Sequence, residues 1–187
     1  MFYCGKFTFF LGSNAVIIGK KESGKTTILR NVVNHCYEKG YTILLFDSKT
    51  STIEKSLLFD ANNKCKDNII IPSPSKEDIK FSDINYNCFP FSIVEKNDHK
   101  IYSFDVSKYS GEESNNLYCK QLVIQELTVM LPIVSKKKCI VIMDEVGFTD
   151  EIRDIINKYN SFDIQFVIAE HYSKNIPNSI FDVQLIL

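Results

Sequence analysis

One segment of eight residues near the start of the chain constrains the fold more than any other feature. Residues 19–26 read GKKESGKT and match the phosphate-binding P-loop pattern G-x-x-x-x-G-K-[ST]. A short apolar run at 15–18 precedes the loop, and a segment with helical periodicity follows it at 26–33. This context predicts a buried strand, a loop and a helix in direct succession, which is the arrangement that a P-loop requires.

The loop predicts a site for a nucleoside triphosphate. Its terminal glycines let several backbone N–H groups point inward at phosphate oxygens, and the start of the helix adds partial positive charge. Lys25 is expected to reach the β- and γ-phosphates, and the Thr26 hydroxyl is expected to ligate Mg²⁺. The predicted phosphate-binding residues are Gly19, Lys20, Lys21, Glu22, Ser23, Gly24, Lys25 and Thr26.

Composition favours a soluble, enzyme-like protein. The 187 residues, 44% of them hydrophobic, fit a single domain spanning 1–187 with a substantial core. A net charge of −1 gives no overall basic field that would indicate nucleic acid. Six scattered cysteines without a C-x-x-C pair favour a reducing compartment over disulfides or a metal site. No apolar run approaches the ~20 residues of a membrane span, so we expect a cytoplasmic protein without a transmembrane segment.

Strand and helix patterns alternate along the chain, which predicts a mostly parallel sheet with helices on both faces. Pro132 is expected to end the longest helix. The stretch at 83–94 fits either edge strands or a loop. Helices are expected at 25–39, 52–59, 113–131 and 151–158, and strands at 15–18, 42–46, 69–71, 100–106, 139–143, 164–169 and 183–187.

Two adjacent acids follow the apolar run at 139–143. A P-loop needs a carboxylate to help hold Mg²⁺, and Asp144 is placed to do this beside Thr26, directly or through water. Glu145 should point to the other side of the strand end, where it can polarise a water for in-line attack on the γ-phosphate. Binding alone would not need this second acid. Hydrolysis, with Glu145 as the general base, is therefore the favoured chemistry.

Two other classes of P-loop protein fit the sequence less well. Residues 144–147 also read as the D-x-x-G of a GTPase, but the N-K-x-D that reads guanine does not follow, since 157–160 read NKYN after a helix. A small-molecule kinase would carry an arginine-rich lid. The chain has only two arginines, Arg30 and Arg153.

The order of these features resembles the HerA–FtsK superfamily of P-loop ATPases, the motors of DNA translocation, conjugation, type IV secretion and viral genome packaging. The resemblance covers nearly the whole chain. Its most specific parts are the P-loop and the acid pair Asp144–Glu145. Its pattern-level parts are a strand ending in Asp47, the run FDVS at 104–107 before a long helix, and the strand that leads into Glu170 and His171.

The resemblance implies a RecA-like fold with an additional strand between the P-loop strand and the strand of Asp144. It implies ATP and Mg²⁺ as ligands, with Thr27 joining Thr26 at the phosphates and Lys25 and Glu145 in catalysis. Members of the family usually end the next strand with Thr-Gln, and the Gln senses the γ-phosphate. Here His171 takes that place and can donate a hydrogen bond to a phosphate or a water, while Glu170 is expected to be a plain strand-end acid.

The chain departs from the family at the arginine that reaches a neighbouring subunit's site. Arg153, Lys158 or a partner protein is left to supply it. The resemblance implies a homo-oligomeric ring acting on DNA, in a cytoplasm, a host-cell cytoplasm or a virion. The alternative is a nucleotide-gated interaction module that hydrolyses little. Whether Asp47, Lys49 or Asp105 touches the site stays open.

Overall fold

A computed structural model describes residues 2–4, 7–9, 12–48, 69–70, 100–105, 113–171, 176–177 and 179–187. Lys49, the helix expected at 52–59 and the stretch 83–94 lie outside these residues.

The described strands form one large parallel sheet. Seven strands pair in the order β5–β6–β4–β7–β8–β3–β9, and every pairing between them is parallel. Strand β8 lies between β3, which enters the P-loop, and β7, which ends in Asp144, so the additional strand is confirmed. The strand bounds are β3 Ala15–Ile18, β4 Thr42–Asp47, β5 Ile69–Ile70, β6 Ile101–Asp105, β7 Cys139–Asp144, β8 Ile164–Glu170 and β9 Val183–Ile186.

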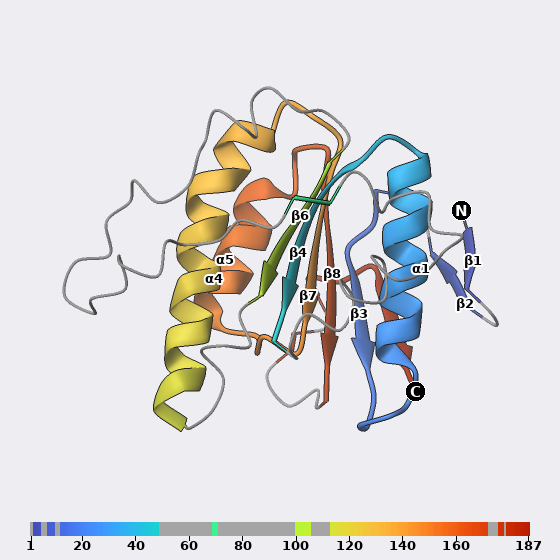
Figure 1. Cartoon of the computed structure of the whole chain (residues 1–187), viewed down its shortest axis with the longest axis horizontal. Coiled ribbons are helices and arrows are strands. Elements are labelled where there is room, and N and C mark those ends of the chain that lie inside the picture. The colour runs from blue at the N-terminus through green and yellow to red at the C-terminus, as the bar shows by residue number, and fades with distance from the viewer. Residues whose placement is uncertain are drawn as a thin grey trace.

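Helices cover both faces of the sheet, as Figure 1 shows. Helix α1 (Lys25–Glu38) lies on one face, and helices α4 (Glu113–Val134) and α5 (Asp150–Tyr159) lie on the other. Alternate side chains of each strand enter opposite cores, because successive residues of a strand point to opposite faces. The predicted α/β class, a mostly parallel sheet with helices on both faces, is therefore confirmed.

Helix α1 forms where the sequence predicts it. Its apolar residues recur at helical spacing and are buried against the sheet, while Gly24 (φ 95°) precedes the helix and Gly40 (φ 80°) follows it. Both glycines adopt the left-handed region that other residues avoid. The buried apolar stripe consists of Ile28, Leu29, Val32, Val33 and Cys36.

Pro132 does not end the long helix. Helix α4 continues to Val134, so the expectation that it would stop at Pro132 is wrong. The proline removes one backbone donor close to the end of the helix, where few further bonds depend on it. The helix still closes regularly, because Ser135 N donates to the Leu131 carbonyl at 2.8 Å and Ser135 Oγ donates to the Pro132 carbonyl at 3.0 Å.

A short antiparallel pair at the start of the chain has no counterpart in the predicted elements. Strand β1 (Phe2–Cys4) pairs with β2 (Phe7–Phe9) as a two-stranded sheet of its own.

The sequence favoured reduced cysteines and predicted no membrane span, and the described residues can be compared with both expectations. Cys36 and Cys139 are buried free thiols, and burial raises the pKa of both, that of Cys36 to about 12. Across the described part of the chain, no helix combines the length and the apolar character needed to cross a bilayer.

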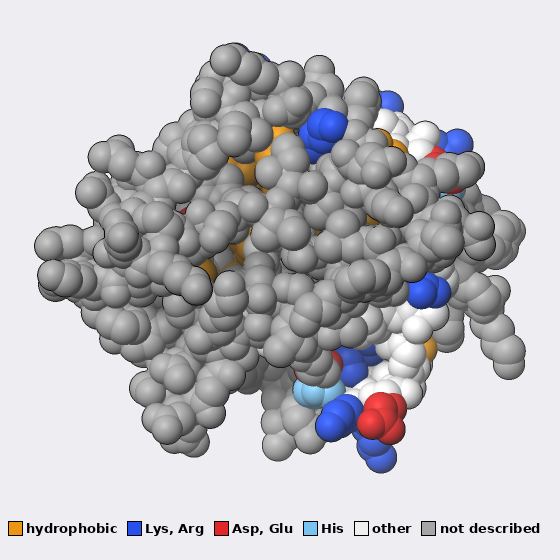
Figure 2. All heavy atoms as spheres, in the orientation of Figure 1, with side chains coloured by type: hydrophobic (Ala, Val, Ile, Leu, Met, Phe, Trp, Pro, Cys, Tyr) orange, Lys and Arg blue, Asp and Glu red, His pale blue; other side chains and the backbone are white. Residues whose placement is uncertain are grey.

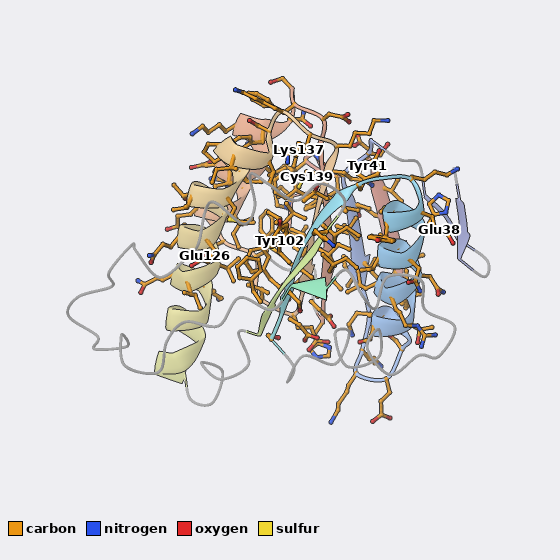
Figure 3. All side chains as sticks on the ribbon, turned by 45° about the horizontal axis from the view of Figure 1, so that its top comes forward. Glu38, Tyr41, Tyr102, Glu126, Lys137 and Cys139 are labelled. Carbon is orange, nitrogen blue, oxygen red and sulfur yellow. The ribbon has the colours of Figure 1, made fainter. Side chains whose placement is uncertain are left out.

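Helix α4 carries an acid whose ionisation opposes folding. Glu126 lies on this helix (Figure 3), and burial raises the pKa of its carboxyl to about 7. At pH values between the pKa of this carboxyl in the unfolded chain and pH 7, the folded chain therefore binds more protons at Glu126 than the unfolded chain does. The free energy of unfolding must fall as the pH rises through that range.

We predict that Glu126→Gln stabilises the protein above pH 7 by on the order of 1–2 kcal/mol and has little effect near pH 5, where the wild-type carboxyl is neutral when folded. Urea denaturation at pH 5 and pH 8 measures this difference. A variant that is equally destabilised at both pH values would show that burial does not disfavour the ionised form of Glu126.

Candidate functional site

The candidate site lies at the end of the sheet to which the parallel strands point, called here the carboxyl end. The P-loop follows β3, the acid pair lies at the end of β7, and His171 follows β8. Figure 2 shows lysine, acidic and histidine side chains gathered at the lower edge of the molecule, toward which the strand arrows of Figure 1 point. This is the end at which open α/β sheets bind ligands.

The P-loop backbone alternates in a way that suits an anion. Glu22 (φ 65°) and Gly24 (φ 95°) both have left-handed conformations, and Ser23 N donates to the Lys20 carbonyl at 3.2 Å. Such alternation turns successive N–H groups toward a common concavity. Gly19 meets a different requirement, because a Cβ at this position would contact the Ser23 Oγ.

Lys25 is the most enclosed charged residue of the loop. It is the first residue of α1, and its side chain is only 4% exposed. Its Nζ donates to the carbonyls of Gly19 at 2.7 Å and Lys20 at 2.8 Å, and it lies 3.3 Å from Glu145 Oε1. The ammonium group is therefore held at the mouth of the loop by partners that a phosphate can replace.

Thr26 and Asp144 meet as predicted. The Thr26 hydroxyl donates to Asp144 Oδ2 at 3.3 Å, and Asp144 is fully buried. A hydroxyl and a carboxylate are oxygen donors of the kind that Mg²⁺ prefers, with its other ligands coming from water or substrate phosphate. The described residues contain no cluster of three or more His, Cys, Asp or Glu side chains that could hold a metal by itself. The donor set thus fits an ion shared with a phosphate.

Glu145 lies between the side chains of Lys25 and His171. Its Oε2 is 2.8 Å from His171 Nε2, opposite the contact of Oε1 with Lys25, and its side chain is only 8% exposed. The short contact requires His171 Nε2 to carry a proton, because two lone pairs would repel. His171 Nδ1 in turn lies 3.2 Å from the Gly19 carbonyl and 3.4 Å from Lys25 Nζ.

The end of β4 also reaches the site, through a residue that the sequence analysis missed. Ser48 Oγ donates to the Glu145 carbonyl at 2.9 Å, and Ser48 N donates to the Asp144 carbonyl at 3.2 Å. The signal was available, since Ser48 directly follows an apolar strand at the carboxyl end. Asp47 is fully buried, and its backbone pairs in register with both Asp144 and Asp105.

Glu170 is not the plain strand-end acid that was expected. It is partly buried, and its Oε1 accepts a hydrogen bond from Gly147 N at 2.7 Å. Burial, and to a lesser extent the charges of Glu145 and Asp144, raise the pKa of the Glu170 carboxyl to about 7, against the opposing effects of the Gly147 N–H and Lys120. Glu170 therefore belongs to the surroundings of the acid pair.

The remaining predicted residues lie outside this cluster. Lys20, Lys21 and Thr27 are exposed on the loop and the first turn of α1. Arg153, in the first turn of α5, is paired with Asp150 at 2.7 Å and Asp154 at 3.6 Å. Lys158 lies in the last turn of α5, with its Nζ 5.3 Å from the centre of the Tyr159 ring. Neither cation lies in the site of its own chain.

Comparison with protein-family models finds no match, and comparison with curated protein sequences finds none either. Among solved structures, the genome packaging NTPase B204 from Sulfolobus turreted icosahedral virus 2, in complex with ATP-gammaS, is similar with a TM-score of 0.44 and 12% identity. The alignment covers 85% of this chain and 64% of that chain.

Proposed function

We propose that the chain binds ATP at the P-loop and hydrolyses it, as a motor domain of the HerA–FtsK type that drives DNA translocation, packaging or conjugative transfer. One observation carries the proposal. Lys25, Asp144 and Glu145 converge at the carboxyl end with the contacts that phosphate binding and water activation need. The sequence motif alone could have matched by chance, but a chance match would not bring the later acid pair against the loop lysine and threonine.

The residues divide the chemistry as follows. Lys25 exchanges the Gly19 and Lys20 carbonyls for phosphate oxygens, which are stronger partners because they are charged. Thr26 and Asp144 would hold Mg²⁺, which would neutralise charge on the bound phosphates. Glu145 accepts the proton of the attacking water, once Lys25 has moved to the nucleotide and released one of its oxygens.

His171 acts as the sensor in this proposal. Its Nε2 already holds Glu145 Oε2, and its Nδ1 lies beside the Gly19 carbonyl at the loop. The imidazole thus connects the loop with the base. A nucleotide that displaces Lys25 removes its contact with Nδ1 and releases Glu145 Oε1, while Nε2 keeps its contact with Oε2. A ring N–H of the imidazole can also orient a water by donating a hydrogen bond to it.

A nucleotide-gated interaction module remains the second candidate, and one observation favours it. Both Glu145 oxygens are engaged by Lys25 and His171, and Arg153 is paired with two acids of its own helix. With Glu145 held by Lys25 and His171, and Arg153 held by acids of its own helix, the chain would bind ATP but hydrolyse little. Hydrolysis would then wait for a second subunit or a partner protein to supply an arginine finger. Such a residue typically contributes ~10³–10⁵ in rate.

Steady-state hydrolysis of ATP by the purified chain tests the proposal. We expect turnover that requires Mg²⁺, increases with double-stranded DNA and rises more than linearly with protein concentration as rings assemble. GTP in place of ATP tests base preference, omission of Mg²⁺ tests the metal requirement, and Lys25→Ala purified in the same way controls for contaminating activity. ATP binding without turnover under every condition would reject the stand-alone motor in favour of the module.

A further inference from the structure

The loop between β7 and α5 carries the proposed base in an unusual backbone conformation. Two of its residues, Glu145 (φ 54°) and Gly147 (φ 91°), lie in the left-handed region. A residue with a Cβ rarely adopts this conformation unless its surroundings impose it. The direction of the Glu145 side chain therefore depends on the groups that hold the loop from outside.

Hydrogen bonds hold this loop to residues at the ends of β4 and β8. Glu145 N donates to the Ala169 carbonyl at 2.8 Å, and the Glu145 carbonyl accepts from Ser48 Oγ at 2.9 Å. Gly147 N donates to Glu170 Oε1 at 2.7 Å. The first two bonds fix the backbone on either side of the base. The third fixes the next turn of the loop, and it comes from the side chain at the end of β8.

Glu170 reaches Gly147 from the face of the sheet opposite the P-loop lysine and threonine. Side chains alternate along a strand, and Ile168 enters the core beneath α4 and α5, so Glu170 lies on that same face. Lys120 of α4 covers Gly147 closely enough that a Cβ there would contact its Cε. The Lys120 charge and the Gly147 N–H both favour the ionised carboxylate. Gly147 is thus enclosed by a residue of β8 and a residue of α4.

We infer that Glu170 is a positioning residue for the proposed hydrolysis, since it fixes Gly147 and so sets the direction in which Glu145 faces the nucleotide. The inference rests on the proposed function. The hydrogen bond of Glu170 is made to Gly147 and not to Lys25 or Thr26. The effect of Glu170 on the base therefore passes through the loop. A base displaced by a fraction of an ångström loses its alignment with the attacking water, whereas nucleotide binding depends on the P-loop and is left intact.

Glu170→Ala and Glu170→Gln separate positioning from a general structural role. The alanine variant loses the acceptor for Gly147 N, and we expect kcat to fall by roughly 100-fold while the Kd for ATP stays within about threefold. The glutamine variant keeps an acceptor oxygen, so we expect its kcat to return to within about threefold of wild type. Glu126→Ala removes another partly buried glutamate with a raised pKa and serves as the matched control.

Three results would overturn the inference: an unchanged kcat in Glu170→Ala, an equal loss in Glu126→Ala, or a parallel loss of kcat and ATP affinity. Hydrogen exchange at the Gly147 amide gives a readout that does not require activity. It should be faster in Glu170→Ala and unchanged in Glu170→Gln. A wild-type chain without turnover rejects the proposed hydrolysis and the positioning role of Glu170 together, whereas an active wild type matched by Glu170→Ala rejects this inference alone.

Discussion

Glu145→Gln should lower the rate of ATP hydrolysis by roughly 10²–10⁴-fold, the usual contribution of a positioned general base. The amide cannot accept the proton of the attacking water. It still fills the same space and can accept a hydrogen bond from Lys25 or from His171 Nε2, so the loop and the phosphate site should keep their structure. The affinity for ATP should therefore stay within a few-fold of the wild-type value.

Single-turnover hydrolysis beside equilibrium binding of ATP measures both halves of this prediction. Glu38→Gln, which changes an exposed acid at the far end of α1, is the matched control and should behave as wild type. If Glu145→Gln turns over ATP at the wild-type rate, Glu145 is not the base, and the nucleotide-gated module becomes the better account. If it loses binding as well, Glu145 acts in holding the site rather than in proton transfer.

Lys25→Ala should weaken ATP binding by about 100-fold or more. The ammonium group is placed to make at least two charge-assisted hydrogen bonds to phosphate, each worth ~1.5–3 kcal/mol, and every 1.4 kcal/mol is tenfold in affinity. The substitution also removes the ammonium group that lies 3.3 Å from the buried Glu145 carboxylate. We therefore expect a modest loss of stability in the absence of nucleotide.

Thermal unfolding with and without ATP separates these two effects. ATP should raise the Tm of the wild type, because a ligand that binds only the folded state stabilises it by mass action, and it should leave the Tm of Lys25→Ala unchanged. Lys39→Ala removes an exposed lysine beyond the end of α1 and serves as the control for lost charge. An equal ATP-dependent shift in wild type and Lys25→Ala would place nucleotide binding elsewhere on the chain.

Much of the fold was predictable from local pattern. The apolar runs that became β3, β4, β7 and β8 are short and bounded by polar or glycine residues, so their period and length were decisive. The position of β8 between β3 and β7 was a different matter. It came from the resemblance to a known superfamily, because no property of the run at 164–169 states which strands it will neighbour.

The residues that meet at the carboxyl end were predictable from the sequence, but most of their contacts were not. The P-loop motif and the acid pair identified Lys25, Thr26, Asp144 and Glu145 because each chemical role demands a particular residue type. The contact of Glu170 with Gly147 depends on strand register and on the left-handed turn at Glu145. Both are set by tertiary packing, so a strand-end acid and a loop glycine 23 residues apart gave no sign of meeting.

Calorimetric titration of the wild-type chain with ATP in the presence of Mg²⁺ tests the central claim most directly. We predict a single saturable isotherm with about one ATP per chain and a Kd in the micromolar range, on the order of 1–100 μM. The same titration of Lys25→Ala should show no saturation over that range. Absence of binding to the wild type at ATP concentrations up to about 1 mM would contradict the assignment of this cluster as a nucleotide site.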